Sequence, residues 1–228
     1  MATYDLEEQE QIAELKAWWK QYGNLVAGVA TVAALGVLAW QGWNWYQRNQ
    51  AAQASAVYGV LQQAVAENDL QRIKTSSGEL LEKFPSTVYA SLAALTAAKA
   101  TNEAGDAKTA KLQLVWVTEH GKDELRDLAR LRLVALLLDE KAYDDALKQI
   151  EGAVSPGFAA RFQDTRGDVF NAQGKKSEAR AAYQAALAAL AETDKSGKEK
   201  SNLPGAQQAN SAYGELLQLK LDALGEGN

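Results

Sequence analysis

A run of 27 residues without a charged side chain, from Gln21 to Gln47, constrains this chain of 228 residues more than any other feature. Its centre, Leu25 to Trp40, consists almost entirely of Ala, Val, Leu and Gly. Continued to Tyr46 as a helix, it would be roughly 33 Å long at about 1.5 Å per residue, close to the hydrocarbon thickness of a bilayer at about 30 Å. The run therefore predicts a transmembrane helix over residues 23–46.

Aromatic side chains gather at both ends of this run. Because Trp and Tyr rings prefer the headgroup level of a membrane, the two clusters predict the two membrane interfaces. A buried core helix would not need them, and a cleaved signal peptide would have a short basic leader, whereas five acidic residues precede Lys16. We therefore favour an uncleaved anchor. The predicted interface residues are Trp18, Trp19 and Tyr22 at one end, and Trp40, Trp43, Trp45 and Tyr46 at the other.

Basic residues beside the span predict its orientation. Lys16 and Lys20 precede it, and Arg48 is the only basic residue among the twenty that follow. The positive-inside rule then places the N-terminus in the cytoplasm and the remainder outside it, which in a bacterium is the periplasm. We expect a short cytoplasmic amphipathic segment over 1–22, a transmembrane helix over 23–46 and, in a bacterium, a periplasmic domain over 47–228.

A block with the spacing G-x-x-F-x-x-x-G-x-x-x-x-A-x-x-x-Y-x-x-A begins at Gly167 and ends at Ala186. It resembles the tetratricopeptide repeat, in which small residues let two antiparallel helices approach and a turn glycine joins them. A second copy of this pattern lies 33 residues earlier, and a third lies 36 residues before that. A more degenerate copy covers about 54–87. The matching positions are Gly167, Phe170, Gly174, Ala179, Tyr183 and Ala186; Val134, Leu137, Lys141, Ala146, Ile150 and Ala153; and Ala98, Thr101, Gly105, Ala110, Leu114 and Val117.

These repeats predict an all-α fold, a single transmembrane helix followed by a tetratricopeptide-like α-solenoid. One hairpin cannot bury its apolar face alone, so neighbours must stack. An irregular helical bundle is the alternative. The polar, turn-rich stretch Thr193–Pro204 predicts a mobile loop, and a last helix over about 206–224 would cap the array.

The composition excludes several kinds of site. Without cysteine the chain cannot form disulfides or thiolate zinc sites, and its single histidine, His120, rules out sites that need two. The net charge of −5 argues against binding nucleic acid, and no catalytic or nucleotide-binding motif is present. We expect no enzyme activity, no metal and no cofactor. We place His120 at a helix end, where it interacts with the negative pole of the helix.

Recognition of other proteins remains as the function of the repeats. The first helices of stacked repeats line a concave face, and their polar residues select the ligand. The repeat phase places five polar residues there, with ordinary solvated surface as the alternative interpretation. They are Lys99, Asn102, Asp164, Asp168 and Asn171.

The stretch IAELKAWWKQYGNLVAGVATVAALGVLAWQGWNWYQ, Ile12–Gln47, followed by the worn repeats, resembles the YfgM-like family over essentially the whole chain. The signature is the WWK-x-x-G entry into the span and the GWNWYQ exit. The resemblance implies a single-span inner-membrane protein that is an ancillary subunit of the SecYEG translocon. It also implies cooperation with the membrane-anchored periplasmic chaperone PpiD on unfolded or nascent secreted proteins. It supplies no catalytic or metal-binding residue. A membrane-anchored scaffold for other envelope assemblies, without a role in secretion, is the alternative, and an enzyme of unfamiliar type ranks third.

Overall fold

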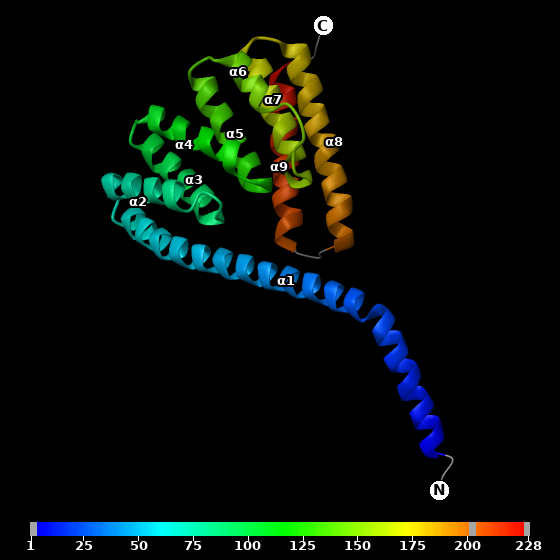
Figure 1. The fold of residues 1–228 in the computed structure, drawn as a ribbon. Coiled ribbons are helices and arrows are strands. Elements are labelled where there is room, and N and C mark those ends of the chain that lie inside the picture. The colour runs from blue at the N-terminus through cyan, green and yellow to red at the C-terminus, as the bar shows by residue number, and fades with distance from the viewer. Residues whose placement is uncertain (1–3, 201–203, 226–228) are drawn as a thin grey trace. The chain divides into compact units, whose positions relative to one another are not determined.

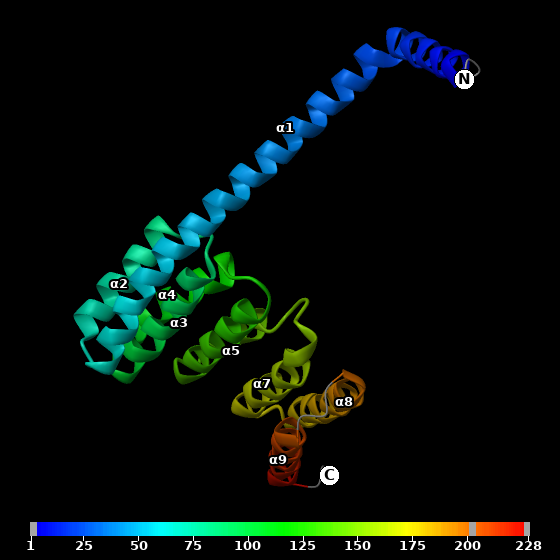
Figure 2. The ribbon, with the colours of Figure 1, turned by 90° about the horizontal axis from the view of Figure 1, so that it is seen from below.

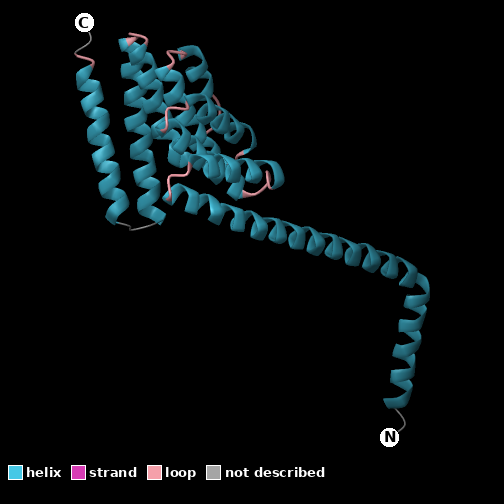
Figure 3. Cartoon of the chain, turned by 90° about the vertical axis from the view of Figure 1, so that its left-hand side faces the viewer, coloured by secondary structure: helices cyan, strands magenta, loops and turns pink. Residues whose placement is uncertain are grey.

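The computed structural model describes residues 4–200 and 204–225, which are helical almost throughout and include no strand (Figure 3). The chain divides into two compact units, one up to Ala52 and one from Gln53. The predicted all-α fold is confirmed. The helices are α1 (Tyr4–Ala66), α2 (Leu70–Lys83), α3 (Val88–Glu103), α4 (Ala107–His120), α5 (Asp123–Asp139), α6 (Tyr143–Gln149), the 3-10 turn η1 (Pro156–Phe158), α7 (Ala159–Ala172), α8 (Lys176–Lys200) and α9 (Pro204–Ala223) (Figure 1).

The first unit consists of most of α1, whose last residues belong to the second unit. Large apolar side chains along the middle of α1 are exposed, with Leu25 at 66%, Val32 at 71% and Leu35 at 60%. Among the described residues, α1 holds the one stretch that is long and apolar enough to cross a membrane. Such a surface is favourable only where the surrounding solvent is itself apolar. No proline interrupts α1, so it runs without a break through residues 22 and 46.

The seven aromatic residues predicted at the membrane interfaces are all exposed and form two clusters on α1. Ring centroids lie 5.8 Å apart for Trp18 and Tyr22, and 6.2 Å apart for Trp43 and Tyr46. Between the inner edges of the clusters the helix rises about 27 Å at about 1.5 Å per residue, close to a hydrocarbon thickness of about 30 Å. Their location at the interfaces stays a prediction.

The described part of the second unit contains four helical hairpins, each closed by the same kind of turn. The end of α1 pairs with α2, and the others are α3 with α4, α5 with α6, and α7 with α8. At each turn one residue has positive φ, and the next residue donates its amide to a carbonyl five residues back, which satisfies the helix end. The positive-φ residues are Asn68, Gly105, Lys141 and Gly174, and the amide bonds are Asp69 to Ala64 (2.9 Å), Asp106 to Thr101 (2.8 Å), Ala142 to Leu137 (2.8 Å) and Lys175 to Phe170 (2.9 Å).

The close packing of α7 on α8 in the last hairpin depends on a glycine in α7. A Cβ atom on Gly167 of α7 would lie 2.4 Å from Cε1 of Tyr183, which is far too close. Without it, the Tyr183 ring packs directly on the α7 backbone and is 2% exposed. Ala179 and Ala186 on α8 are fully buried. The small and aromatic positions identified in the sequence therefore hold this hairpin together.

The hairpins follow one another in chain order across the second unit (Figure 2). Each buries its apolar face against its neighbours, so the core is distributed in three clusters along the array. Lysines of one hairpin also reach the turn of the next: Lys74 Nζ lies 2.7 Å from Asp106 Oδ2, and Lys111 Nζ lies 2.5 Å from Glu140 Oε2.

The third hairpin departs from the predicted repeat. Its second helix, α6, ends at Gln149, and Ala153, expected on that helix, lies exposed in the loop before η1. Gly152 has a φ of 88° and Pro156 follows, and neither suits a helix interior. Asp144 and Asp145 lie in the first turn of α6, where acidic side chains interact favourably with the helix dipole.

A buried ion pair organises this loop. Asp127 and Arg130 on α5 have side chains 1% and 11% exposed, and Arg130 Nη1 lies 3.2 Å from Asp127 Oδ1. The guanidinium group donates to the carbonyls of Gln149 (2.6 Å), Glu151 and Ala153 (3.2 Å), and lies 4.6 Å from the centre of the Phe162 ring. Asp127 Oδ2 accepts from the amide of Ser155 at 2.7 Å. These bonds replace the backbone bonds that α6 would have made had it continued.

The structure differs from the predicted polar loop over 193–204. Residues up to Lys200 continue α8, and α9 begins at Pro204, while residues 201–203 lie outside the described residues. The three lysines of this stretch and Glu199 are good helix formers, and Gly197 alone costs only about 1 kcal/mol relative to alanine. A helix that has already formed therefore extends through it. Pro204 suits the first position of the next helix.

Candidate protein-binding site

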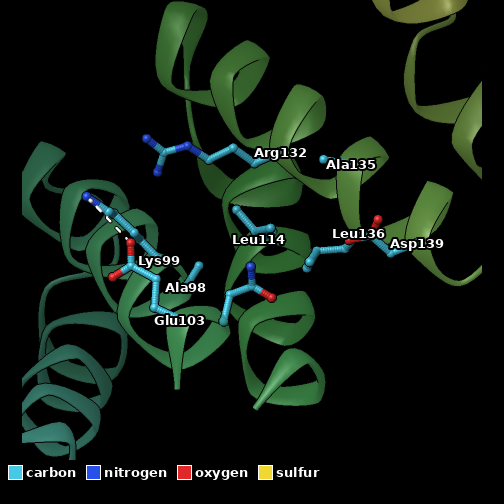
Figure 4. Close-up of a pocket in the computed structure, with 9 residues that line it drawn as sticks. Ala98, Lys99, Glu103, Leu114, Arg132, Ala135, Leu136 and Asp139 are labelled. Atoms are coloured by element: carbon cyan, nitrogen blue, oxygen red, sulfur yellow. Dashed lines mark ion pairs between the residues drawn. The ribbon is translucent and has the colours of Figure 1, made fainter. Parts of the chain in front are cut away.

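A groove of about 270 Å³ lies between α3 and α5, with α4 beneath it (Figure 4). The first helices of two consecutive hairpins form its walls, as expected for the concave side of a repeat array. Lys99 and Glu103 stand on the α3 side, Arg132 and Asp139 stand on α5, and Leu114 of α4 lies between them (Figure 4). The remaining lining residues are Ala98, Asn102, Ala135 and Leu136.

The groove combines an apolar floor with exposed groups of both charges. Lys99 Nζ lies 3.8 Å from Glu103 Oε1, and both side chains are about two-thirds exposed. Such an exposed ion pair is weak, so either group can bind a ligand instead. Arg132 donates to the carbonyl of Leu95 at 3.3 Å, which tethers the guanidinium group to the α3 wall. Such a surface can bind the polar backbone of a peptide, with Ala135 as its exposed apolar contact.

Asp164 and Asp168 of α7, which the repeat phase also places on the concave face, are bound by α9 instead. Lys220 Nζ lies 2.7 Å from Oδ1 of each aspartate. The Tyr213 hydroxyl donates to Asp164 at 3.0 Å, and the Tyr183 hydroxyl donates to Asp168 at 2.8 Å. The network therefore fastens the last helix to the last hairpin.

The pKa values in this network follow from its burial and its charges. Burial, followed by the nearby carboxylates, raises the pKa of both Tyr183 and Tyr213, so both hydroxyls stay protonated as donors. Burial lowers the pKa of Lys220, but its hydrogen bonds to Asp164 and Asp168 outweigh that effect and raise it overall. Lys220 therefore stays protonated at neutral pH.

The five predicted binding residues thus lie in different surroundings. Lys99 and Asn102 line the groove, Asp164 and Asp168 face Lys220, and Asn171 is exposed in the last turn of α7. Sequence reasoning missed the α5 side of the groove. Stepping Lys99 and Glu103 forward by the repeat interval of 36 leads to Ala135 and Asp139, both of which line it.

His120 is the last residue of α4, as predicted for a helix end. Its ring stacks on Trp116 with centroids 4.6 Å apart, and its Nδ1 lies 3.0 Å from the Trp116 carbonyl oxygen. Since a carbonyl only accepts, Nδ1 donates in this hydrogen bond. In the ranges that the structure describes, no group of three His, Asp or Glu side chains could hold a metal ion.

Comparison with known proteins gives a consistent result. The sequence profile of the tetratricopeptide repeat-like domain matches residues 16–226. A protein of Neisseria gonorrhoeae named ancillary SecYEG translocon subunit is 32% identical over 96% of this chain and 98% of its own length. Proteins of the same name from Haemophilus influenzae and Escherichia coli K12 are 31% and 30% identical, over 81% and 79% of this chain and 90% and 87% of their own lengths.

No solved structure matches the chain closely enough to add to this comparison. The profile covers both the apolar part of α1 and the hairpins, and the Neisseria relative aligns almost from end to end. The chain therefore belongs to the YfgM-like family of tetratricopeptide repeat-like proteins, whose relatives in Neisseria, Haemophilus and Escherichia are named ancillary SecYEG translocon subunits.

Proposed function

We propose that this chain is an inner-membrane-anchored protein-binding module and an ancillary subunit of the SecYEG translocon. The observation that carries the proposal is its similarity, over 96% of its length, to a relative with that name. Both parts that such a subunit needs are present: an apolar helix to hold it in the membrane and a repeat array to bind protein. A helical scaffold of this kind favours binding over catalysis.

The groove between α3 and α5 is the proposed contact surface for unfolded or nascent secreted proteins. Its exposed charges of both signs and its amide at Asn102 suit an extended backbone with mixed side chains. The walls are two separate helices, so an extended segment can touch both hairpins at once. Binding there is expected to be weak, because the groove is small beside a standard protein interface.

Anchoring compensates for weak binding. A module held beside the channel meets emerging segments at a high effective concentration, so modest affinity suffices. In this proposal the array works with the membrane-anchored chaperone PpiD, which receives the same clients. The N-terminus lies in the cytoplasm and the array lies in the periplasm.

Affinity purification of the full chain from native membranes in mild detergent, with partners identified by mass spectrometry, tests the assignment. Recovery of SecY, SecE, SecG and PpiD is the expected result, and a variant lacking residues 1–47 shows which contacts need the anchor. If other envelope complexes are recovered and the channel is not, a scaffold without a role in secretion replaces the proposal.

A photo-crosslinking residue at Asn102 tests the groove. We expect it to crosslink to secreted proteins in transit, and the same residue at Lys148, which is exposed outside the groove, to crosslink far less. Equal yields at both positions would exclude the groove as the contact surface. Depletion of the channel should abolish the Asn102 product if the substrate arrives through it.

Orientation can be measured cleanly because the natural chain has no cysteine. With the outer membrane permeabilised, a membrane-impermeant maleimide should label Lys148→Cys and leave Gln11→Cys unmodified. Labelling of Gln11→Cys alone would reverse the proposed topology.

A further inference from the structure

A second cavity, of about 560 Å³, lies in the second unit where two turns between hairpins come together. One wall is the turn after α2 with the start of α3, and the other is the turn between α4 and α5. It shares no lining residue with the groove described above. Its volume is in the range that binds small ligands or a few residues of a peptide.

The start of α3 points to the kind of group that this cavity accepts. At the starts of α2 and α4, Asp69 and Asp106 accept a bond from the backbone amide three residues on. Thr87 makes no such bond at the start of α3, because its hydroxyl donates to the Phe84 carbonyl, and the first turn of α3 contains no acidic residue. The Ala90 amide donates to the Thr87 carbonyl at 3.3 Å, so the amides of Val88 and Tyr89 and the positive pole of the helix are left for an external acceptor.

Ser91 in the same turn provides an independent observation. It is 5% exposed and lines the cavity, yet its hydroxyl forms no hydrogen bond with any residue that the structure describes. Its oxygen is not fully enclosed by the protein, so the hydroxyl can donate to a group in the cavity. An acceptor in the cavity would satisfy the Ser91 hydroxyl together with the free amides of Val88 and Tyr89.

The remaining walls limit the ligand further. Val88 is 54% exposed, and with Leu92 and Leu125 it provides an apolar surface beside the helix start. Lys122 adds a positive charge, but Asp123 and Glu124 on the same turn disfavour a ligand with several negative charges. The site suits one anionic group next to an apolar side chain.

We propose that this cavity binds the carboxylate of an apolar peptide segment, held by the first-turn amides of α3 and the Ser91 hydroxyl, with the neighbouring side chain on Val88, Leu92 and Leu125. The site is separate from the groove and does not depend on the translocon assignment. In a protein that binds unfolded chains, it would recognise a chain end or an acidic side chain among apolar ones.

Fluorescence polarisation with the full chain in detergent tests this proposal. The probe is fluorescein-labelled Gly-Gly-Ala-Leu-Val with a free carboxylate, compared with the same peptide ending in an amide and with an amidated peptide in which glutamate replaces the last valine. We expect the free acid to bind at least about tenfold more tightly than the amide, because the amide cannot form the charged hydrogen bonds. Binding of the glutamate peptide would identify a side-chain carboxylate as a second source of the same group.

Two variants locate the binding. Ser91→Ala should weaken binding of the free acid about tenfold, while Ser76→Ala, another buried serine outside the cavity, should not change it. Val88→Glu places a carboxylate on the helix start itself and should abolish the preference for the acid without lowering the melting temperature; Val88→Gln should retain the preference. Equal affinity for acid and amide, absence of binding, or an unchanged affinity in Ser91→Ala would each overturn the proposal.

Discussion

Along α1 from Tyr22 to Tyr46, leucine, valine and tryptophan side chains are exposed and no charge is present, whereas in the second unit Asp127 and Arg130 are buried as an ion pair. In a protein surrounded by water, large apolar side chains are usually buried and charged side chains are usually exposed. Both arrangements are the reverse of this. In α1 the reversal is favourable because lipid replaces water as the solvent. In the second unit it is tolerated because every charged atom meets a partner. Whether a side chain is buried therefore depends on the surrounding solvent and on the hydrogen bonds and ion pairs available to it, and not on its hydrophobicity alone.

Removing one partner of the buried pair should have the largest effect. Arg130→Met leaves Asp127 buried without its countercharge and three carbonyls without a donor, so we expect destabilisation by about 3–5 kcal/mol. Denaturant unfolding followed by circular dichroism measures it. Arg132→Met, two residues along the same helix, removes one bond at the surface and should change stability little. A similar decrease in the free energy of unfolding in both variants would mean that the ion pair between Asp127 and Arg130 contributes nothing beyond packing.

A charge placed on the exposed apolar face of α1 should have the next largest effect, and on a different property. Val32→Arg should make membrane insertion less favourable by about 2.5–3.5 kcal/mol, because it places a guanidinium group near the bilayer centre. Insertion by microsomal or membrane-fraction assays measures this, with Val32→Leu as the control. The thermal unfolding of the hairpins should stay the same. If it also shifted, the two units would not be independent.

Gly167→Ala tests the close contact between α7 and α8. The added Cβ would overlap the Tyr183 ring, so we expect a loss of about 1–3 kcal/mol in the free energy of unfolding. Gly78→Ala in α2 is the matched control, since nothing lies within 4 Å of its Cβ position and alanine is the better helix former. It should be neutral or slightly stabilising. A neutral Gly167→Ala would contradict the tight packing of this hairpin.

The smallest effect concerns a partly exposed ion pair between hairpins, Lys74 with Asp106. The hydrogen bond from Lys74, supported by Thr109, lowers the pKa of Asp106 to about 2. Because the folded pKa lies below the usual value of 3.8, the bond stabilises the fold above that pH and is lost as the pH falls towards 2. An NMR titration of the Asp106 carboxyl group should give a midpoint near the lowered value. In Lys74→Gln it should move upward, while Lys108→Gln should leave it unchanged.

Much of this architecture could be predicted from short-range patterns. The uncharged run, its aromatic ends and the spacing of Gly167, Gly174 and Tyr183 are local features, and they led to the anchor and the hairpins. The end of α6 and the extension of α8 to Lys200 were not predicted. Helix ends depend on small free-energy differences between competing local conformations, so propensity places them poorly.

The binding surface was predicted only in part, for a different reason. Lys99 and Asn102 follow from the repeat phase, but the same phase gives no sign that Lys220, more than fifty residues further on, occupies the carboxylates of Asp164 and Asp168. The cavity beside Ser91 likewise joins two turns that are distant in the sequence.

The amino-acid sequence by itself therefore determined that the apolar part of α1 suits lipid and the hairpins suit water. It also determined which helical unit is repeated. Both depend on the identity and spacing of neighbouring residues. The tertiary structure alone decided which polar groups are paired and which remain free to bind. Pairing depends on side chains from different hairpins meeting at hydrogen-bond distance, and that geometry arises only when the hairpins stack.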